Sequence, residues 1–142
     1  MAERYLVNYY GPMRDALNQG MGSDRLEVDW WINSPEVEQR MRGVFPSSPL
    51  VKPFSFVLLG TQPKGYPLPG KIRLGLTTSP VFLEIPPNIQ ALRDMRISAV
   101  KKWRIATRKL FLHYFSRGYQ VVDFLKMPYK GKNRYFYVLK KK

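Results

Sequence analysis

The stretch from residue 98 to residue 139 constrains the fold more than any other part of this 142-residue chain. Along 98–117, apolar side chains recur at alternating intervals of three and four residues, a spacing that predicts one buried helix face. This inward stripe consists of Val100, Trp103, Thr107, Leu110 and Tyr114. Gly118 suits the left-handed conformation that ends many helices. Two aromatic-rich segments, 119–125 and 134–139, follow and predict a pair of antiparallel strands.

Shorter patterns upstream predict the remaining elements. Alternating or apolar runs predict strands over 4–10, 26–32, 54–59, 71–76 and 81–85. Helices are predicted over 13–19, 36–43 and 88–95, and Ser34 and Pro35 have the residue types that begin the second of these. Residues 60–70 have the glycines and prolines of an irregular loop. We therefore expect a single α+β domain over residues 1–142, with a mixed or antiparallel sheet, a long helix packed on it and a C-terminal β-hairpin.

Residues 44–53 have the composition of a connector. They hold three prolines and two serines, and we expect any joint between subdomains to lie there.

The composition excludes several classes of function. The chain has no cysteine and one histidine, which excludes disulfides, thiolate catalysis and cysteine-ligated zinc, and we expect no metal site. No apolar run reaches the ~20 residues of a membrane span. The first residues lack the basic and then apolar layout of a signal peptide. We therefore expect a cytoplasmic protein that does not contact a membrane.

The net charge of +14 is concentrated at one end of the chain. Residues 101–142 carry 13 lysines and arginines against one acid, Asp123. Such a field attracts polyanions such as nucleic acid or the phosphates of a nucleotide cofactor, although a solubility face would have the same composition.

One hypothesis is a basic module that binds nucleic acid by phosphate contact and base stacking. Its candidate residues are Arg104, Arg108, Arg117, Lys130, Lys132, Arg134 and Tyr135. A non-catalytic interaction or dimerisation domain, in which an exposed Trp31 and the final hairpin form the contact, is a further alternative.

Both halves of the chain carry a resemblance to the GNAT acyltransferase superfamily. In that superfamily a helix with a tyrosine shortly before a terminal glycine is followed by two strands, as in Tyr114 to Gly118 here, and Val81–Ile85 resembles the strand beside the acyl-CoA cleft. The upstream block comprises Tyr9-Tyr10-Gly11, Asp24-Arg25, Asp29-Trp30-Trp31 and Ser34-Pro35. This block resembles a family of predicted bacterial and archaeal GNAT acetyltransferases, in which it lies downstream of the coenzyme A motif. The resemblance implies a GNAT-like fold, acetyl-CoA as acyl donor, and an upstream GNAT half or a second copy as partner.

The resemblance also suggests catalytic residues. Tyr114 matches the position of a tyrosine that faces the sulfur of coenzyme A, which implies a general acid for the leaving thiolate. Simple packing on the inward stripe is the alternative. Glu27, Asp29 and Glu84 are candidate general bases or solvated strand charges. Arg104 and Arg108 are candidates for the cofactor phosphates. Asp24 and Arg25 are interpreted as an ion pair within a turn.

One element of the superfamily does not match. Its pyrophosphate loop presents backbone N–H groups from the start of a helix. The nearest match here is 62–67, in which Pro63 lacks an N–H group, and Pro67 and Pro69 would break the helix that must follow. We expect this loop to be absent or degenerate and acetyl-CoA to bind weakly or not at all.

Overall fold

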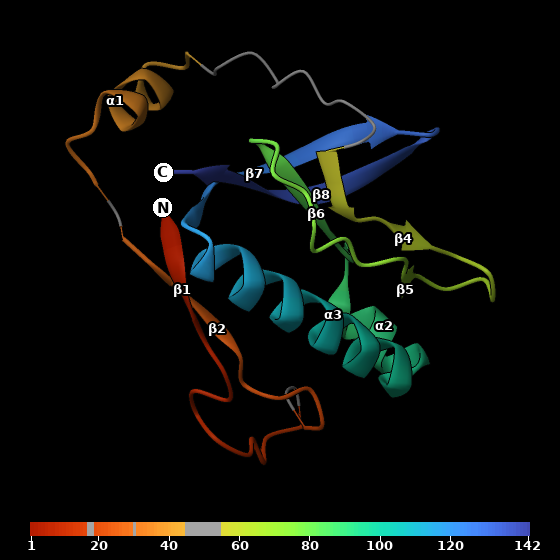
Figure 1. Cartoon of the computed structure of the whole chain (residues 1–142). Helices are drawn as coiled ribbons and strands as arrows, with labels where there is room; N and C mark the ends of the chain where they lie inside the picture. The colour runs from red at the N-terminus through yellow and green to blue at the C-terminus, as the bar shows by residue number, and fades with distance from the viewer. Residues whose placement is uncertain (17–18, 30, 45–54) are drawn as a thin grey trace.

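The chain forms a six-stranded sheet with a long helix across one face (Figure 1). The computed structural model describes residues 1–16, 19–29, 31–44 and 55–142. The strands of this sheet are β1 (Ala2–Leu6), β2 (Arg25–Val28), β3 (Phe56–Leu58), β6 (Val81–Ile85), β7 (Tyr119–Tyr129) and β8 (Lys132–Lys141). Their order is β2-β1-β7-β8-β6-β3, and every neighbouring pair is antiparallel except β3 and β6. The predicted α+β class with a mostly antiparallel sheet is confirmed.

The long helix α3 (Ile97–Ser116) packs its predicted stripe on the sheet. Val100, Leu110 and Tyr114 are completely buried, and Trp103 is nearly so. These side chains pack against apolar side chains of β6 and β8, and together they belong to the main core. Gly118 has a φ of +80°, the left-handed value expected after the helix. The short helix α2 (Ile89–Met95) precedes α3 and begins with the Asn88 side chain accepting from the Ala91 N–H.

The hairpin of β7 and β8 is longer than the sequence predicted. Both strands continue to a two-residue turn, Lys130–Gly131, whose φ values of +50° and +78° fit the turn type that matches strand twist. The tight turn keeps Met127 and Pro128 in the ladder, beyond the predicted end of the first strand at residue 125. On the sheet face opposite α3, Phe56, Phe82 and Phe136 form a second, smaller core.

Two predicted assignments in the middle of the chain are wrong. The predicted loop 60–70 contains a small hairpin of β4 (Gly60–Thr61) and β5 (Leu68–Pro69). The predicted strand 71–76 forms no ladder. Its Arg73 and Leu74 carbonyls instead accept from side chains of α3, the Tyr114 hydroxyl at 2.8 Å and His113 Nε2 at 2.6 Å. Side chains of the helix thus satisfy backbone groups that a neighbouring strand would otherwise satisfy.

In the N-terminal region, only some of the predicted helices and strands are formed. Helix α1 (Pro35–Met41) begins as predicted, with Ser34 Oγ accepting from the Val37 N–H at 3.3 Å. Strand β1 ends at Leu6 because the chain turns at Asn8, which has a φ of +48°. The predicted helix 13–19 is not formed by its described residues.

Some of the predicted features fall on residues that are not described. Residues 17–18, Trp30 and Phe54, together with 45–53 of the predicted joint, lie outside the described residues. No helix in the described ranges is both long enough and apolar enough to cross a bilayer.

Candidate functional site

A cleft opens along α3 where the two parts of the sheet separate. Strand β1 pairs with β7 at one position, Ala2 opposite Val121, and the remainder of β1 pairs with β2. Residues of α3, of the β1–β2 pair and of β6, β7 and β8 enclose a volume of about 880 Å³. This volume lies within the range of small-molecule sites.

Four aromatic rings line this cleft in succession. The ring centroids of Tyr5 and Phe111 are 5.3 Å apart, those of Phe111 and Tyr137 are 5.6 Å apart, and those of Tyr137 and Phe124 are 5.2 Å apart. The rings come from β1, α3, β8 and β7, so the wall exists only in the assembled fold. Phe124 is 48% exposed and lies at the open side. Together the rings present an apolar wall to a ligand.

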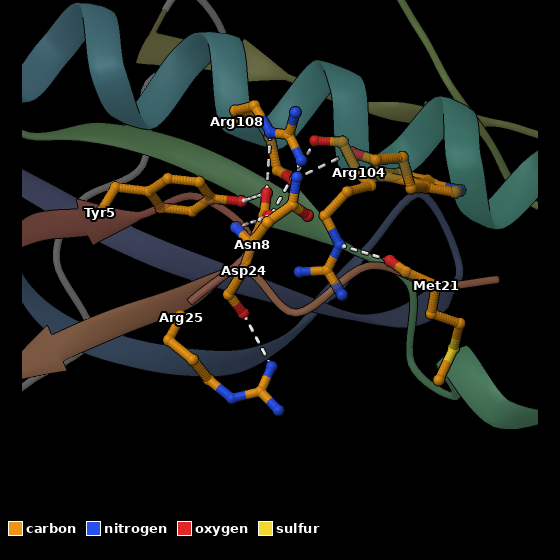
Figure 2. Close-up of polar contacts among 9 residues, drawn as sticks. Tyr5, Asn8, Met21, Asp24, Arg25, Arg104 and Arg108 are labelled. Atoms are coloured by element: carbon orange, nitrogen blue, oxygen red, sulfur yellow. Dashed lines mark hydrogen bonds and ion pairs between the residues drawn. The ribbon is translucent and has the colours of Figure 1, made fainter. Parts of the chain in front are cut away.

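Asp24, just before β2, is the buried carboxylate of the cleft (Figure 2). It accepts hydrogen bonds from Arg108 Nε at 2.8 Å and Nη2 at 2.9 Å, from the Tyr5 hydroxyl at 2.7 Å and from the Asn8 N–H at 3.0 Å. Burial alone would raise the pKa of Asp24, but these hydrogen bonds outweigh burial and hold the pKa below its ordinary value. Asp24 is therefore an anion at neutral pH, and its contacts with Tyr5 and Arg108 fasten β1 to α3.

The expected ion pair between Asp24 and Arg25 is not formed. Arg25 donates from Nη1 to the backbone carbonyl of Asp24 at 2.8 Å, and its guanidinium lies 5.2 Å from the centroid of the Tyr10 ring. The Asp24 carboxylate is turned toward Arg108, because the helix lies on the buried side of the strand (Figure 2).

Arg104 lies one helical turn before Arg108 and lines the cleft. Its Nε donates to the Met21 carbonyl at 3.3 Å (Figure 2), and no carboxylate of the described residues pairs with its terminal nitrogens. Burial and the hydrogen bond to Asp24 raise the pKa of Tyr5 to about 12, against the opposing positive charge of Arg104. Arg104 is thus a half-buried cation beside a neutral phenol.

The charges that line the cleft leave a positive surplus. The lining includes Arg25, Arg40, Arg104, Asp24 and Asp123. Arg40 pairs with Asp123 at 2.8 Å, and Asp24 is neutralised by Arg108, which is not itself part of the lining. The cleft therefore favours anions.

Tyr137 is a cleft residue to which the sequence analysis assigned no catalytic or acceptor-binding role. No described residue forms a hydrogen bond with its hydroxyl. Burial raises the pKa of Tyr137, so the phenol is protonated at neutral pH and can donate. The one available signal was the alternation in β8, which places residues 135, 137 and 139 on the face toward α3.

Tyr114, the predicted general acid, lies outside the lining of this cleft. It is fully buried, its hydroxyl donates to the Arg73 carbonyl, and its ring packs edge-on against Tyr119 with centroids 5.1 Å apart. Burial raises the pKa of Tyr114. The hydroxyl of Tyr114 is thus engaged in a hydrogen bond with the backbone of the fold.

Glu84, the buried candidate base, is engaged in a second ion pair. Arg134 donates from Nε to Oε1 at 2.7 Å and from Nη2 to Oε2 at 2.9 Å. Gly60 adds its N–H to Oε2 at 2.5 Å, and its carbonyl accepts from Arg134 Nη2 at 2.6 Å. The cluster borders a smaller hollow of about 300 Å³, which Lys130 and Lys132 also line.

The other two candidate bases lie on the exposed edge of the sheet. Glu27 pairs with Arg4 at 2.7 Å, and neither Glu27 nor Asp29 lines the cleft.

The structure separates the residues of the nucleic-acid hypothesis. Arg104 and Arg108 lie at the cleft, and Arg117 is exposed at the C-terminal end of α3. The remaining candidates, Lys130, Lys132, Arg134 and Tyr135, lie on the C-terminal hairpin. The Lys126 ammonium is 5.9 Å from the centroid of the Tyr135 ring.

The described residues do not form the coenzyme A pyrophosphate cradle of the GNAT superfamily. Residues 62–67 connect β4 to β5, and no helix follows them. The Gly65 N–H points back to the Gln62 carbonyl at 3.4 Å instead of outward to a ligand. These residues therefore do not fit a bound pyrophosphate. No group of three or more potential metal-ligating side chains occurs among the described residues.

Comparison with known proteins gives no assignment for this chain. No protein-family model matches it, and neither curated proteins nor solved structures give a significant match.

Proposed function

We propose that this chain is the acceptor-binding part of a GNAT-type N-acyltransferase, and that the cleft along α3 holds the acceptor. The observation that carries the proposal is the cleft itself, with its aromatic wall, its surplus positive charge and a phenol without a partner among the described residues. The order of the long helix, Gly118 and the two final strands, which resembles the GNAT superfamily, supplies the reaction class.

The proposal places the donor site on a second polypeptide. Residues 62–67 do not offer the N–H groups that coenzyme A phosphates need, so no step at the donor is assigned to this chain. An upstream GNAT half is the partner that the resemblance suggests.

The residues of this chain would bind and orient the acceptor. The aromatic wall excludes water from one side of the ligand, and the Asp24–Arg108 pair holds β1 and α3 at a fixed separation. Tyr137 holds a proton at its hydroxyl oxygen and can donate a hydrogen bond to a ligand in the cleft.

The test is acyl transfer by a reconstituted pair. The chain is co-expressed with the polypeptide encoded immediately upstream, and thiol release from acetyl-CoA is followed with a panel of small amines. We expect amine-dependent release from the pair, and no acetyl-CoA binding by this chain alone in calorimetry. Tyr137→Phe should lower the transfer rate, whereas the matched variant Tyr135→Phe, which does not line the cleft, should not. Sub-micromolar binding of acetyl-CoA to the isolated chain, or a pair that is inactive with every amine, would overturn the proposal.

A specific observation also favours polyanion binding as a second function. Lys101, Lys102 and Lys109 are exposed on the outer side of α3, and no described residue forms an ion pair with them. Their charge is therefore free to attract phosphates in solution. This surface is separate from the cleft, so the two functions are testable independently.

A further inference from the structure

We infer that the cleft along α3 selects a small aromatic carboxylate and that Arg104 binds its carboxylate. The inference rests on the proposed function in treating this cleft as the acceptor site, and it adds the chemical class of the acceptor. Arg104 is the lining cation whose charge no described carboxylate neutralises and which belongs to the rigid helix α3.

The geometry of Arg104 favours a carboxylate. Its Nε donates to the Met21 carbonyl at 3.3 Å, its guanidinium also interacts with the Tyr5 side chain, and its two terminal nitrogens form a planar fork that no described carboxylate occupies. A guanidinium fork matches the two oxygens of a carboxylate and binds them with two parallel hydrogen bonds. Arg108 cannot serve in this way, because two of its nitrogens are bound to Asp24.

The lining around Arg104 favours an aromatic body. Phe111 lies two turns further along the same helix face, about 10 Å along the helix axis at 1.5 Å per residue. Tyr137 and Phe124 continue the wall from there. A ring joined to its carboxylate by a short carbon chain would reach both Arg104 and this wall. If the site serves N-acylation, the acceptor class is a free aromatic amino acid.

Arg104 has fewer contacts with the rest of the fold than Arg108. It is half-exposed, its hydrogen bond to the Met21 carbonyl is long at 3.3 Å, and its interaction with Tyr5 involves no carboxylate, whereas the neighbouring Arg108 forms the ion pair with buried Asp24. A substitution at Arg104 should therefore report on ligand binding rather than on folding.

The experiment compares three probes by isothermal titration calorimetry with the full chain: 3-phenylpropionate, the neutral 3-phenylpropan-1-ol and inorganic phosphate. We expect the carboxylate to bind more tightly than either of the others. Arg104→Gln should weaken carboxylate binding by about 10- to 100-fold, the range expected for hydrogen bonds to a charged group, and leave binding of the alcohol unchanged. Arg104→Lys should recover only part of the loss because it restores charge without the fork. The control is Arg117→Gln, an equal change of charge on the same helix outside the cleft.

Several outcomes would overturn the inference. These are equal binding of the alcohol and the carboxylate, equal or tighter binding of phosphate, no binding of any probe, and unchanged affinity in Arg104→Gln. If Arg104→Gln does not fold, amide shifts of the wild-type chain on titration with 3-phenylpropionate decide, since they must include Arg104 and Tyr137. Binding of 3-phenylpropionate by a chain whose reconstituted pair transfers no acyl group would support this inference and refute the proposed function.

Discussion

Two buried ion pairs use the same chemistry to different ends. Asp24 with Arg108 and Glu84 with Arg134 are both bidentate, and each joins elements far apart in the chain, by 84 and 50 residues respectively. In the second pair, both groups also bind the backbone of Gly60. In the first pair, the surrounding groups are Tyr5 of β1 and Asn8 of the turn after it, and a second arginine, Arg104, lies beside the pair in the cleft.

The Glu84–Arg134 pair therefore joins parts of the fold, whereas the Asp24–Arg108 pair also determines the charge of the cleft. The Glu84 cluster satisfies its own donors and acceptors and so joins β4, β6 and β8 with little left for a ligand. Asp24 neutralises Arg108 and thereby leaves the charge of Arg104 uncompensated. Because Asp24 pairs with Arg108 alone, the adjacent Arg104 adds an uncompensated positive charge to the cleft.

The largest expected effect comes from removing either carboxylate. Asp24→Asn and Glu84→Gln should each destabilise the fold by about 3–5 kcal/mol, because each leaves a buried or half-buried arginine without its partner. Urea unfolding of the full chain measures the loss. Asp29→Asn, at an exposed position, is the control and should change stability by less than about 0.5 kcal/mol. A loss below about 1 kcal/mol in either buried variant would contradict the role given to that pair.

The Asp24–Arg108 pair also predicts a dependence of stability on pH. The pKa of Asp24 is lowered in the folded state, so its charge adds stability above the unfolded value near ~4, and this stability is lost as the pH falls through the lower folded value. The stability difference between wild type and Asp24→Asn should therefore shrink when unfolding is measured at successively lower pH below ~4. A difference that stays constant down to pH ~2 would show that Asp24 is not held as an anion.

Two tyrosines test the same contrast on a smaller scale. Tyr114→Phe removes a buried hydrogen bond to the Arg73 carbonyl and should cost about 1–2 kcal/mol of stability. Tyr137→Phe removes a hydroxyl to which no described residue is hydrogen-bonded, and should change stability by less than about 0.5 kcal/mol. Thermal and urea unfolding of the two variants, side by side, give the comparison. Equal losses would mean that Tyr137 is as firmly engaged as Tyr114.

The smallest effect on stability is expected on the outer side of α3. Replacing Lys101, Lys102 and Lys109 together by Gln leaves the ion pairs and the cleft intact, so stability should barely change. Binding to duplex DNA should nevertheless lose up to about three phosphate contacts, and the slope of log K against log salt should become shallower by up to about 2.7. An unchanged slope, measured by fluorescence anisotropy, would assign polyanion binding to another surface. No DNA binding by the wild-type chain at ~0.15 M salt would remove the polyanion function.

The parts of the fold that local chemistry determines were predictable. The stripe on α3, the stop at Gly118, the cap at Ser34 and the final antiparallel strands follow from residues close in sequence. The predicted strand over 71–76 was wrong because alternation alone does not supply a neighbouring strand. There, the carbonyls of Arg73 and Leu74 are satisfied by helix side chains.

The candidate site was less predictable because long-range contacts create it. Arg104 and Arg108 were both candidates for contact with phosphates, yet a carboxylate 84 residues away from Arg108 gives the two arginines different roles. No local pattern distinguishes the two arginines, because residues four apart on a helix lie on the same face and have the same position relative to the core. Tyr137 is likewise one of two tyrosines in β8, and it lines the cleft because β1 separates from β7 there.

The single register pair between β1 and β7 has a consequence for hydrogen exchange. Beyond Ala2 and Val121, the β1–β2 hairpin is held to the rest of the molecule mainly through side chains, among them the Asp24 cluster and the stacked rings of Tyr5 and Phe111. A segment fastened in this way can open as one cooperative unit at a lower free energy than the extensively paired β7 and β8. Amide protons of β1 and β2 should therefore exchange together and earlier than those of the C-terminal hairpin. The same opening would give a ligand a path into the cleft. A ligand bound in the cleft should therefore slow amide exchange in β1 and β2 before it affects the C-terminal hairpin.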